Sequence, residues 1–114
     1  TINYFQQKIM VTQLTSSSFQ AFITKNPIAV VDFYADWCGP CKVIGPILED
    51  LSKELTLVGF GKVNADDEGV LAGQFNISSI PTVLIFKNGT PVNQLVGAMS
   101  KDAFKRAFEA AQAS

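Results

Sequence analysis

Hydrophobic residues along the chain alternate between strand-like runs and helix-like spacing. The clearest run is Ile28–Tyr34, which is almost continuously apolar and rich in β-branched residues. Such a run is typical of a central strand that is covered on both faces. The residues after it predict a long helix to about residue 55, with a buried stripe at helical spacing: Val43, Ile44, Ile47, Leu48, Leu51 and Leu55. Gly45-Pro46 is expected to kink this helix.

On the N-terminal side of the central strand, residues 9–14 predict a short first strand. The run Thr15-Ser16-Ser17-Ser18 offers N-cap residues, and Phe19, Phe22 and Ile23 follow at helical spacing. These features predict a helix over about residues 16–25, which Asn26-Pro27 would end. Residues 1–8 show no clear period and are expected to be an N-terminal extension to a domain of residues 9–114.

On the C-terminal side, residues 57–64, 82–86 and 91–96 predict strands, and Asn88-Gly89 predicts a hairpin turn between the last two. Acidic residues 66–68 are expected at the start of a short helix that includes Val70, Leu71 and Phe75. Ser100 is expected to cap a final helix that places several apolar residues on one face: Ala103, Phe104, Ala107, Phe108 and Ala111. The expected order is βαβαβαββα. It indicates an α/β fold with a central mixed β-sheet, closed by a hairpin and flanked by helices on both faces.

Composition narrows the class of protein. A chain of 114 residues has room for one domain with one core. With 47% hydrophobic residues and a net charge of -1, the composition argues against disorder, a coiled coil and nucleic-acid binding. The longest uncharged apolar stretch near the start, residues 9–11, is too short to span a membrane or to act as a signal.

The candidate chemistry lies at Cys38 and Cys41, which are the only two cysteines. They lie at the junction between the central strand and the long helix. The free N–H groups and the macrodipole at the start of a helix stabilise a thiolate. Pro40 suits the first helical position, and Cys41 is close enough for a disulfide with Cys38. A structural zinc site would need four Cys or His ligands, and the chain has no histidine. An inert buried pair would leave the placement at a helix start unexplained. A redox-active pair in a reducing compartment is the preferred interpretation.

The sequence Trp37-Cys38-Gly39-Pro40-Cys41-Lys42 resembles the thioredoxin family, and the resemblance extends over about residues 10–113. It implies the thioredoxin fold and a protein-disulfide reductase that exchanges its dithiol with disulfides of protein substrates. Cys38 is then expected to be the exposed nucleophile and Cys41 the resolving thiol. Oxidants and isomerases of the superfamily usually carry a histidine between the cysteines, so Gly39-Pro40 indicates a reductant.

The same resemblance gives a role to Asp32, which lies in the middle of the apolar strand. A charge there is costly unless it is paired or neutralised, and an outward-facing carboxylate would be the ordinary interpretation. The family instead has a buried Asp at this position, where it looks like a proton acceptor for Cys41. Lys62 in the next strand matches the family lysine that lies near it.

Ser79-Ile80-Pro81-Thr82 matches the cis-proline loop of the family. From base rates alone a trans bond before Pro81 would be expected, but the resemblance implies a cis bond in a loop that faces the disulfide and pairs with an extended substrate. Gly97 is expected at the rim of the site, although an ordinary turn glycine would also fit. The full set expected to contact substrate is Trp37, Gly39, Pro40, Ile80, Pro81, Thr82, Gly97 and Ala98.

Two residues depart from the family pattern. Tyr34 stands where tryptophan is usual, and Gly45 stands where alanine usually precedes Pro46.

The implied partners are protein disulfide substrates and a thioredoxin reductase, with no nucleic acid, membrane, bound cofactor or metal. A cytoplasmic monomer is expected. The alternatives are a disulfide oxidant or isomerase domain, and a binding module that uses the fold as a scaffold.

Overall fold

The structure, a computed structural model, describes residues 11–114. It contains one five-stranded sheet in the order β1-β3-β2-β4-β5. The strands are β1 (Val11–Leu14), β2 (Ile28–Tyr34), β3 (Gly59–Asn64), β4 (Thr82–Lys87) and β5 (Thr90–Val96). The helices are α2 (Phe19–Lys25), α3 (Gly39–Glu54), α4 (Gly69–Gln74) and α5 (Lys101–Ala113). This confirms the expected order βαβαβαββα. The expected extension at residues 1–8 lies outside the described residues.

Strand β2 occupies the centre of the sheet because it pairs on both sides. It runs parallel to β3 and antiparallel to β4, while β1 and β5 form the two edges. The hairpin between β4 and β5 turns at Asn88 and Gly89, which have φ angles of 51° and 83°. Two successive positive φ angles match the turn that suits the twist of a hairpin. The sheet is therefore mixed, as the pattern of the sequence predicts.

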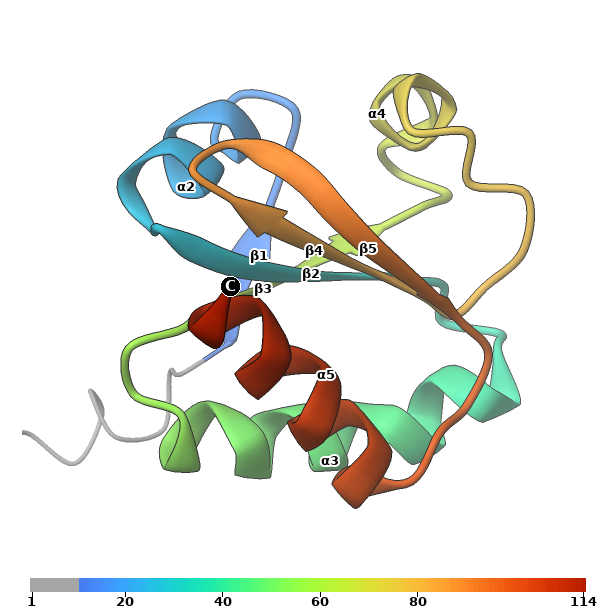
Figure 1. The fold of residues 1–114 in the computed structure, drawn as a ribbon. Coiled ribbons are helices and arrows are strands. Elements are labelled where there is room, and N and C mark those ends of the chain that lie inside the picture. The colour runs from blue at the N-terminus through green and yellow to red at the C-terminus, as the bar shows by residue number, and fades with distance from the viewer. Residues whose placement is uncertain (1–10) are drawn as a thin grey trace, which may run out of the picture.

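Helices cover both faces of the sheet (Figure 1). Helices α2 and α4 lie on one face and α3 and α5 on the other, so alternate residues of β2 enter different cores. Val31 and Phe33 pack in the core beneath α2 and α4, whereas Val30 packs in the core beneath α3 and α5. Because Asp32 follows the same alternation, its side chain lies on the α3 and α5 face.

The first described helix begins later than expected. Residues 15–18 form a turn in which the carbonyl of Thr15 accepts hydrogen bonds from the N–H groups of Ser18 (3.1 Å) and Phe19 (3.0 Å). The hydroxyl of Ser18 accepts a bond from the Thr15 N–H at 3.0 Å and does not cap the helix through its side chain. The prediction of a helix from residue 16 was therefore wrong by three residues, because serine and threonine side chains also stabilise turns.

Two details of the helical pattern also differ. Helix α3 runs through Pro46 and buries Ile44, Leu48 and Leu51, but Val43 is 61% exposed. Placing Val43 in the buried stripe was wrong, since one residue turns the helix by about 100°. The acids at 66–68 precede α4 and do not form its first turn. There, Asn64 Oδ1 accepts hydrogen bonds from the N–H groups of Asp66 and Asp67, at 3.0 and 3.2 Å.

Candidate functional site

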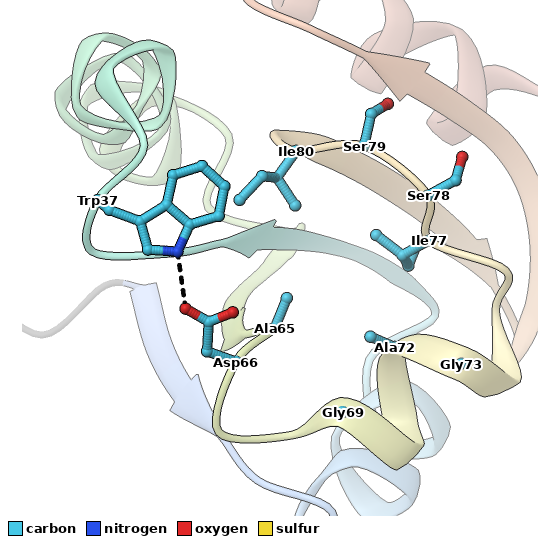
Figure 2. Close-up of a pocket in the computed structure, with 10 residues that line it drawn as sticks. All are labelled: Trp37, Ala65, Asp66, Gly69, Ala72, Gly73, Ile77, Ser78, Ser79 and Ile80. Carbon is cyan, nitrogen blue, oxygen red and sulfur yellow. Dashed lines mark hydrogen bonds between the residues drawn. The ribbon is translucent and has the colours of Figure 1, made fainter.

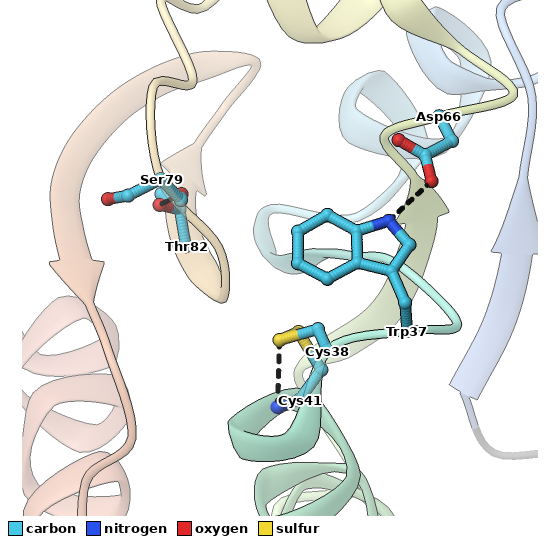
Figure 3. Close-up of a disulfide and its surroundings, with 6 residues drawn as sticks. All are labelled: Trp37, Cys38, Cys41, Asp66, Ser79 and Thr82. Carbon is cyan, nitrogen blue, oxygen red and sulfur yellow. Dashed lines mark hydrogen bonds between the residues drawn. A yellow bond between two sulfur atoms is a disulfide. The ribbon is translucent and has the colours of Figure 1, made fainter.

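The two cysteines form a disulfide at the start of α3. Cys38 is the N-cap of this helix, and its Sγ accepts a hydrogen bond from the Cys41 N–H at 3.2 Å (Figure 3). Pro40 lies in the first turn, where a missing N–H costs nothing. The end of β2 thus delivers Cys38 to a helix start, where the free N–H groups favour a negatively charged sulfur.

The disulfide is largely shielded from solvent. Cys38 is 3% exposed and Cys41 is 6% exposed, and they form a small cluster with Ala35 against which Tyr34 and Ile80 pack. The expectation that Cys38 is the exposed member of the pair was therefore wrong for the disulfide state. Side chains from β2 and from the loop before β4 cover the sulfurs, and no local sequence pattern at Cys38 reveals them.

Trp37 forms an exposed wall beside the disulfide. Its side chain is 71% exposed, and its indole Nε1 donates a hydrogen bond to Asp66 Oδ2 at 2.8 Å (Figure 3). Asp66 follows β3, and because β2 and β3 are parallel, their carboxyl ends meet at one edge of the sheet. Sequence reasoning placed Asp66 at the start of a helix and gave it no role in the site. The signal was its position directly after a strand that pairs with β2.

The loop before β4 lies across from the disulfide (Figure 3). Its Ile80–Pro81 bond is cis, as the resemblance implies. Thr82 Oγ1 donates to the Ser79 carbonyl at 2.6 Å, and the Pro81 carbonyl accepts the Gly97 N–H at 2.8 Å. Gly97 has a φ of +90°, a conformation that favours glycine. This last bond joins the loop before β4 to the loop at Gly97, the two loops expected to contact substrate. Three other residues expected to contact substrate are exposed: Gly39, Pro40 and Ala98.

A groove of about 570 Å³ runs from Trp37 along the loop before β4. Figure 2 shows the Ile80 side chain pointing toward the indole of Trp37, with α4 beneath them. The lining residues are Trp37, Ala65, Asp66, Gly69, Ala72, Gly73, Ile77, Ser78, Ser79 and Ile80. Sequence reasoning named Trp37 and Ile80 as substrate contacts and Ser79 as part of the cis-proline loop. The other lining residues come from α4 and its flanking loops, which carry no catalytic motif.

Asp32 is buried on the side of the sheet covered by α3. It is 5% exposed, and its Oδ1 has no hydrogen-bond partner among residues 11–114. Burial away from water raises the pKa of the carboxyl from 3.8 to about 7, while the positive charge of Lys62 acts in the opposite direction. This confirms the buried position that the resemblance implies and excludes the alternative of an outward-facing carboxylate. A carboxyl with a pKa near neutrality can both accept and return a proton at neutral pH.

Lys62 lies opposite Asp32 in the parallel ladder between β2 and β3. Its Nζ lies 5.7 Å from the centroid of the Tyr34 ring, and the Tyr34 hydroxyl donates to Gln13 Oε1 at 3.0 Å. Within residues 11–114, no group of three or more His, Cys, Asp or Glu side chains is placed to hold a metal ion. In the same part of the chain, no helix combines the length and apolar character needed to cross a membrane.

Comparisons with known proteins agree with this geometry. The family model described as Thioredoxin matches residues 10–110. The chain is 43% identical over 97 residues to thioredoxin of Chlamydia caviae, covering 85% of this chain and 94% of that protein. It is 44% identical over 102 residues to Thioredoxin-1 of Saccharomyces cerevisiae, covering 89% and 98%. Among solved structures, Plasmodium falciparum thioredoxin superposes with a TM-score of 0.83 at 40% identity, covering 88% of this chain and 98% of that one. Matches of this extent show that the chain belongs to the thioredoxin family, in which its Cys38–Cys41 pair makes it a protein-disulfide reductase.

Proposed function

We propose that the reductase works with an ordered division of labour, in which Cys38 attacks the substrate disulfide and Cys41 resolves the mixed disulfide. The observation that carries this assignment is the position of Cys38 as the N-cap of α3, where its sulfur accepts the Cys41 N–H. A thiolate at Cys38 gains this hydrogen bond and the positive end of the helix dipole. Cys41 lies inside the first turn, where the same stabilisation is weaker.

The reaction starts from the reduced pair. The Cys38 thiolate attacks one sulfur of the substrate disulfide, forms a mixed disulfide and releases the first substrate thiolate. Cys41 then loses its proton and attacks Cys38 Sγ, which releases the second substrate thiolate and forms the Cys38–Cys41 disulfide. Two electrons pass from the pair to the substrate, and a reductase must return two electrons to begin the next cycle.

Asp32 is the proposed proton acceptor for Cys41. Its carboxyl is buried on the face of the sheet covered by α3, the helix that carries Cys41, and its pKa is raised to about 7 by burial. A base whose pKa lies near the working pH is suited to remove a proton from a thiol and to release it afterwards.

The substrate is proposed to bind as an extended segment beside the loop before β4. Among residues 11–114, the backbone N–H and carbonyl of Ile80 make no hydrogen bond to other backbone groups, so they are available to a partner strand. The exposed indole of Trp37 and the adjoining groove offer an apolar surface next to the sulfurs. Gly39, Pro40, Gly97 and Ala98 are proposed to complete this contact surface, while Pro81 and Thr82 are buried and are proposed to shape the loop that the substrate meets.

The proposed physiological partners are protein disulfides and a thioredoxin reductase, with no bound cofactor because the dithiol itself holds the electrons. A monomer in a reducing compartment such as the cytoplasm is proposed, with residues 9–114 as the domain and residues 1–8 as an extension. Both cysteines are used by the redox pair, so neither remains for a structural disulfide.

Trapping experiments test the division of labour. Cys41→Ser should lose turnover and accumulate covalent complexes with an oxidised protein substrate, since nothing resolves the mixed disulfide. Cys38→Ser should lose both turnover and capture. Both variants remove one sulfur, so each serves as the control for the other. Equal trapping by the two variants would contradict the assignment.

A redox titration against glutathione tests the direction of the reaction. A reductant should be largely oxidised at potentials where an oxidant of the same fold remains reduced. An insulin reduction assay with dithiothreitol then separates a reductase from a scaffold, because a scaffold would not accelerate the precipitation of insulin chains. A potential in the range of strong oxidants would overturn the proposed direction.

A further inference from the structure

Three polar side chains gather on the sheet face that also holds Asp32. Gln13 of β1 is paired with Lys62 of β3, and Lys62 is paired with Asp32 of β2. Tyr34 lies two residues after Asp32 on the same strand, so its side chain leaves the same face. The topology therefore brings an amide, an ammonium, an aromatic ring and a buried carboxyl together at the carboxyl end of three parallel strands.

The contacts in this group connect Lys62 with Tyr34. The Lys62 ammonium lies over the Tyr34 ring at 5.7 Å from its centroid, which is within the range of a cation–π interaction. The ring is tied at its far end, since the Tyr34 hydroxyl donates to Gln13 Oε1 at 3.0 Å. Gln13 in turn donates through Nε2 to the Lys62 carbonyl at 3.4 Å.

Asp32, by contrast, forms no ion pair with its neighbour Lys62. Lys62 lies directly across the ladder, yet the two side chains do not form an ion pair within 4.0 Å in the described part of the chain. The Oδ1 atom of Asp32 is buried without a hydrogen bond from residues 11–114. Among residues 11–114, Lys62 is the positive charge that acts on this carboxyl, and it is engaged with an aromatic ring instead.

We propose that Tyr34 is a positioning residue that holds the Lys62 ammonium over its ring and so keeps it from pairing with Asp32. The ring and the carboxylate compete for one flexible lysine, and the tie between Tyr34 and Gln13 keeps the ring in place for this competition. Asp32 therefore stays without an ion-pair partner, as a proton acceptor for the resolving thiol requires. This role for Tyr34 rests on the proposed function of Asp32.

Within the described residues, no other charge facing Asp32 takes the place of Lys62. Strand β4 places Val83 opposite the carboxyl, and β3 places Lys62 there. Helix α3 covers this face with Cys41, Ile44 and Leu48, of which Cys41 carries no proton in the disulfide, and α5 covers it with Phe104 and Phe108. Burial raises the pKa of Asp32 and Lys62 lowers it, so a lysine that moves closer must lower it further.

The test is a carbon-NMR titration of the Asp32 carboxyl in the oxidised protein. Tyr34→Leu removes the ring and should increase the acid dissociation constant of Asp32 by about threefold or more, since an opposite charge at close range favours the carboxylate. Tyr34→Phe keeps the ring but removes its hydrogen bond to Gln13, so its effect should be in the same direction and clearly smaller than that of Tyr34→Leu. Tyr34→Met, which fills a similar volume without an aromatic face, carries the same expectation as Tyr34→Leu and replaces it should the leucine variant not fold.

Lys62→Met supplies the control for water entry. This variant alone should decrease the dissociation constant of Asp32, because it removes the favourable charge. In the Lys62→Met background, Tyr34→Leu should have no further effect. A shift of the same size in that background would show that water reaching the carboxyl is the cause, and it would overturn the proposal. An unchanged or decreased dissociation constant in Tyr34→Leu alone would also overturn it.

The proposed function of Asp32 is tested separately by the rate at which a preformed mixed disulfide is resolved. Asp32→Asn should slow this step at neutral pH, and Tyr34→Leu should move the midpoint of its pH profile to lower pH by the same amount as the titration. If Asp32→Asn resolves as fast as wild type, the proton-acceptor role fails, whereas the titration still decides whether Tyr34 holds Lys62.

Discussion

At the scale of a single residue, the buried carboxyl of Asp32 lowers the free energy of unfolding at neutral pH, although its raised pKa suits a proton acceptor. Its pKa is about 7 in the folded protein and about 3.8 when solvated. Between these values the folded chain binds a proton that the unfolded chain has lost, so the free energy of unfolding decreases as the pH rises through this window. Above pH 7 the full cost of burying the charge is present, and below about pH 4 it is absent.

Removing this carboxyl should therefore stabilise the protein in a pH-dependent way. We expect Asp32→Ala to raise the free energy of unfolding of the oxidised protein by roughly 2–4 kcal/mol at pH 8, given about 1.4 kcal/mol for each tenfold change in an acid dissociation constant. At pH 4 the gain should largely vanish, because the native carboxyl is already neutral. Denaturant curves at the two pH values measure this, and a variant no more stable than wild type at pH 8 would contradict it.

The hydrogen bond from Trp37 to Asp66 holds an otherwise exposed indole at the rim of the site. Asp66→Ala should free the indole and decrease its fluorescence anisotropy, a clean readout because Trp37 is the only tryptophan. The Michaelis constant for a protein disulfide should increase, whereas reaction with a small disulfide should change little. Asp67→Ala, one residue later and without this bond, is the matched control. Equal anisotropy in both variants would argue against the anchor.

At the scale of elements, β3 packs closely against β1 and α2 at Gly61. A Cβ added to Gly61 would come within 2.6 Å of Leu14 Cδ1 and 3.1 Å of Phe22 Cε2. Both neighbours are buried in the core beneath α2, so neither can move aside freely. Glycine at this strand position thus allows β1 and α2 to pack tightly against the sheet, although glycine ordinarily weakens a strand.

Alanine should consequently have opposite effects at two glycines. Gly61→Ala should lower the free energy of unfolding by about 1–3 kcal/mol through overpacking. Gly45→Ala, in α3 with nothing within 4 Å of the added Cβ, should raise it by about 0.5–1 kcal/mol through helix propensity. Thermal and urea unfolding of both variants measure the effects. Stabilisation by alanine at position 61 would show that the contact with Leu14 relaxes at no cost.

At the scale of the whole molecule, the sheet has a separate hydrophobic core on each face, whereas the length of the chain predicts one core, because a sheet covered by helices on both faces divides the buried side chains in two. The core beneath α3 and α5 holds Phe108, which packs edge-on against Phe60 with ring centroids 5.5 Å apart and stacks with Phe104 at 5.8 Å. This core lies under α3, the helix whose N-cap is Cys38. Its packing therefore supports the active-site helix as well as the sheet.

Truncation in this core should be costly wherever the structure buries the side chain. Phe108→Ala should lower the free energy of unfolding by about 3–5 kcal/mol. Val43→Ala should change it by less than about 0.5 kcal/mol, since Val43 is exposed although helical spacing places it in the predicted stripe. Urea unfolding measures both variants. A large loss at Val43 would mean that α3 buries a different face.

Much of this protein follows from local sequence patterns. The periods of the hydrophobic residues predict the order of strands and helices, because burial on one or two faces leaves a repeat that each segment carries by itself. The position of Cys38 and Cys41 at a strand-to-helix junction likewise identifies the redox pair. Asp32 stands out for the same local reason, as a charge inside an apolar run.

Other features depend on which distant segments meet. Three features of the site join segments that are separated by a crossover. They are the hydrogen bond between Trp37 and Asp66, the packing of Ile80 against the cysteines, and the groove along α4. The contact between Tyr34 and Lys62 depends on the register of β2 and β3. A side chain's own neighbours in sequence carry no record of such partners. The sequence by itself therefore determined the elements and the reactive pair, whereas the tertiary structure decided what surrounds that pair and how its charges are balanced.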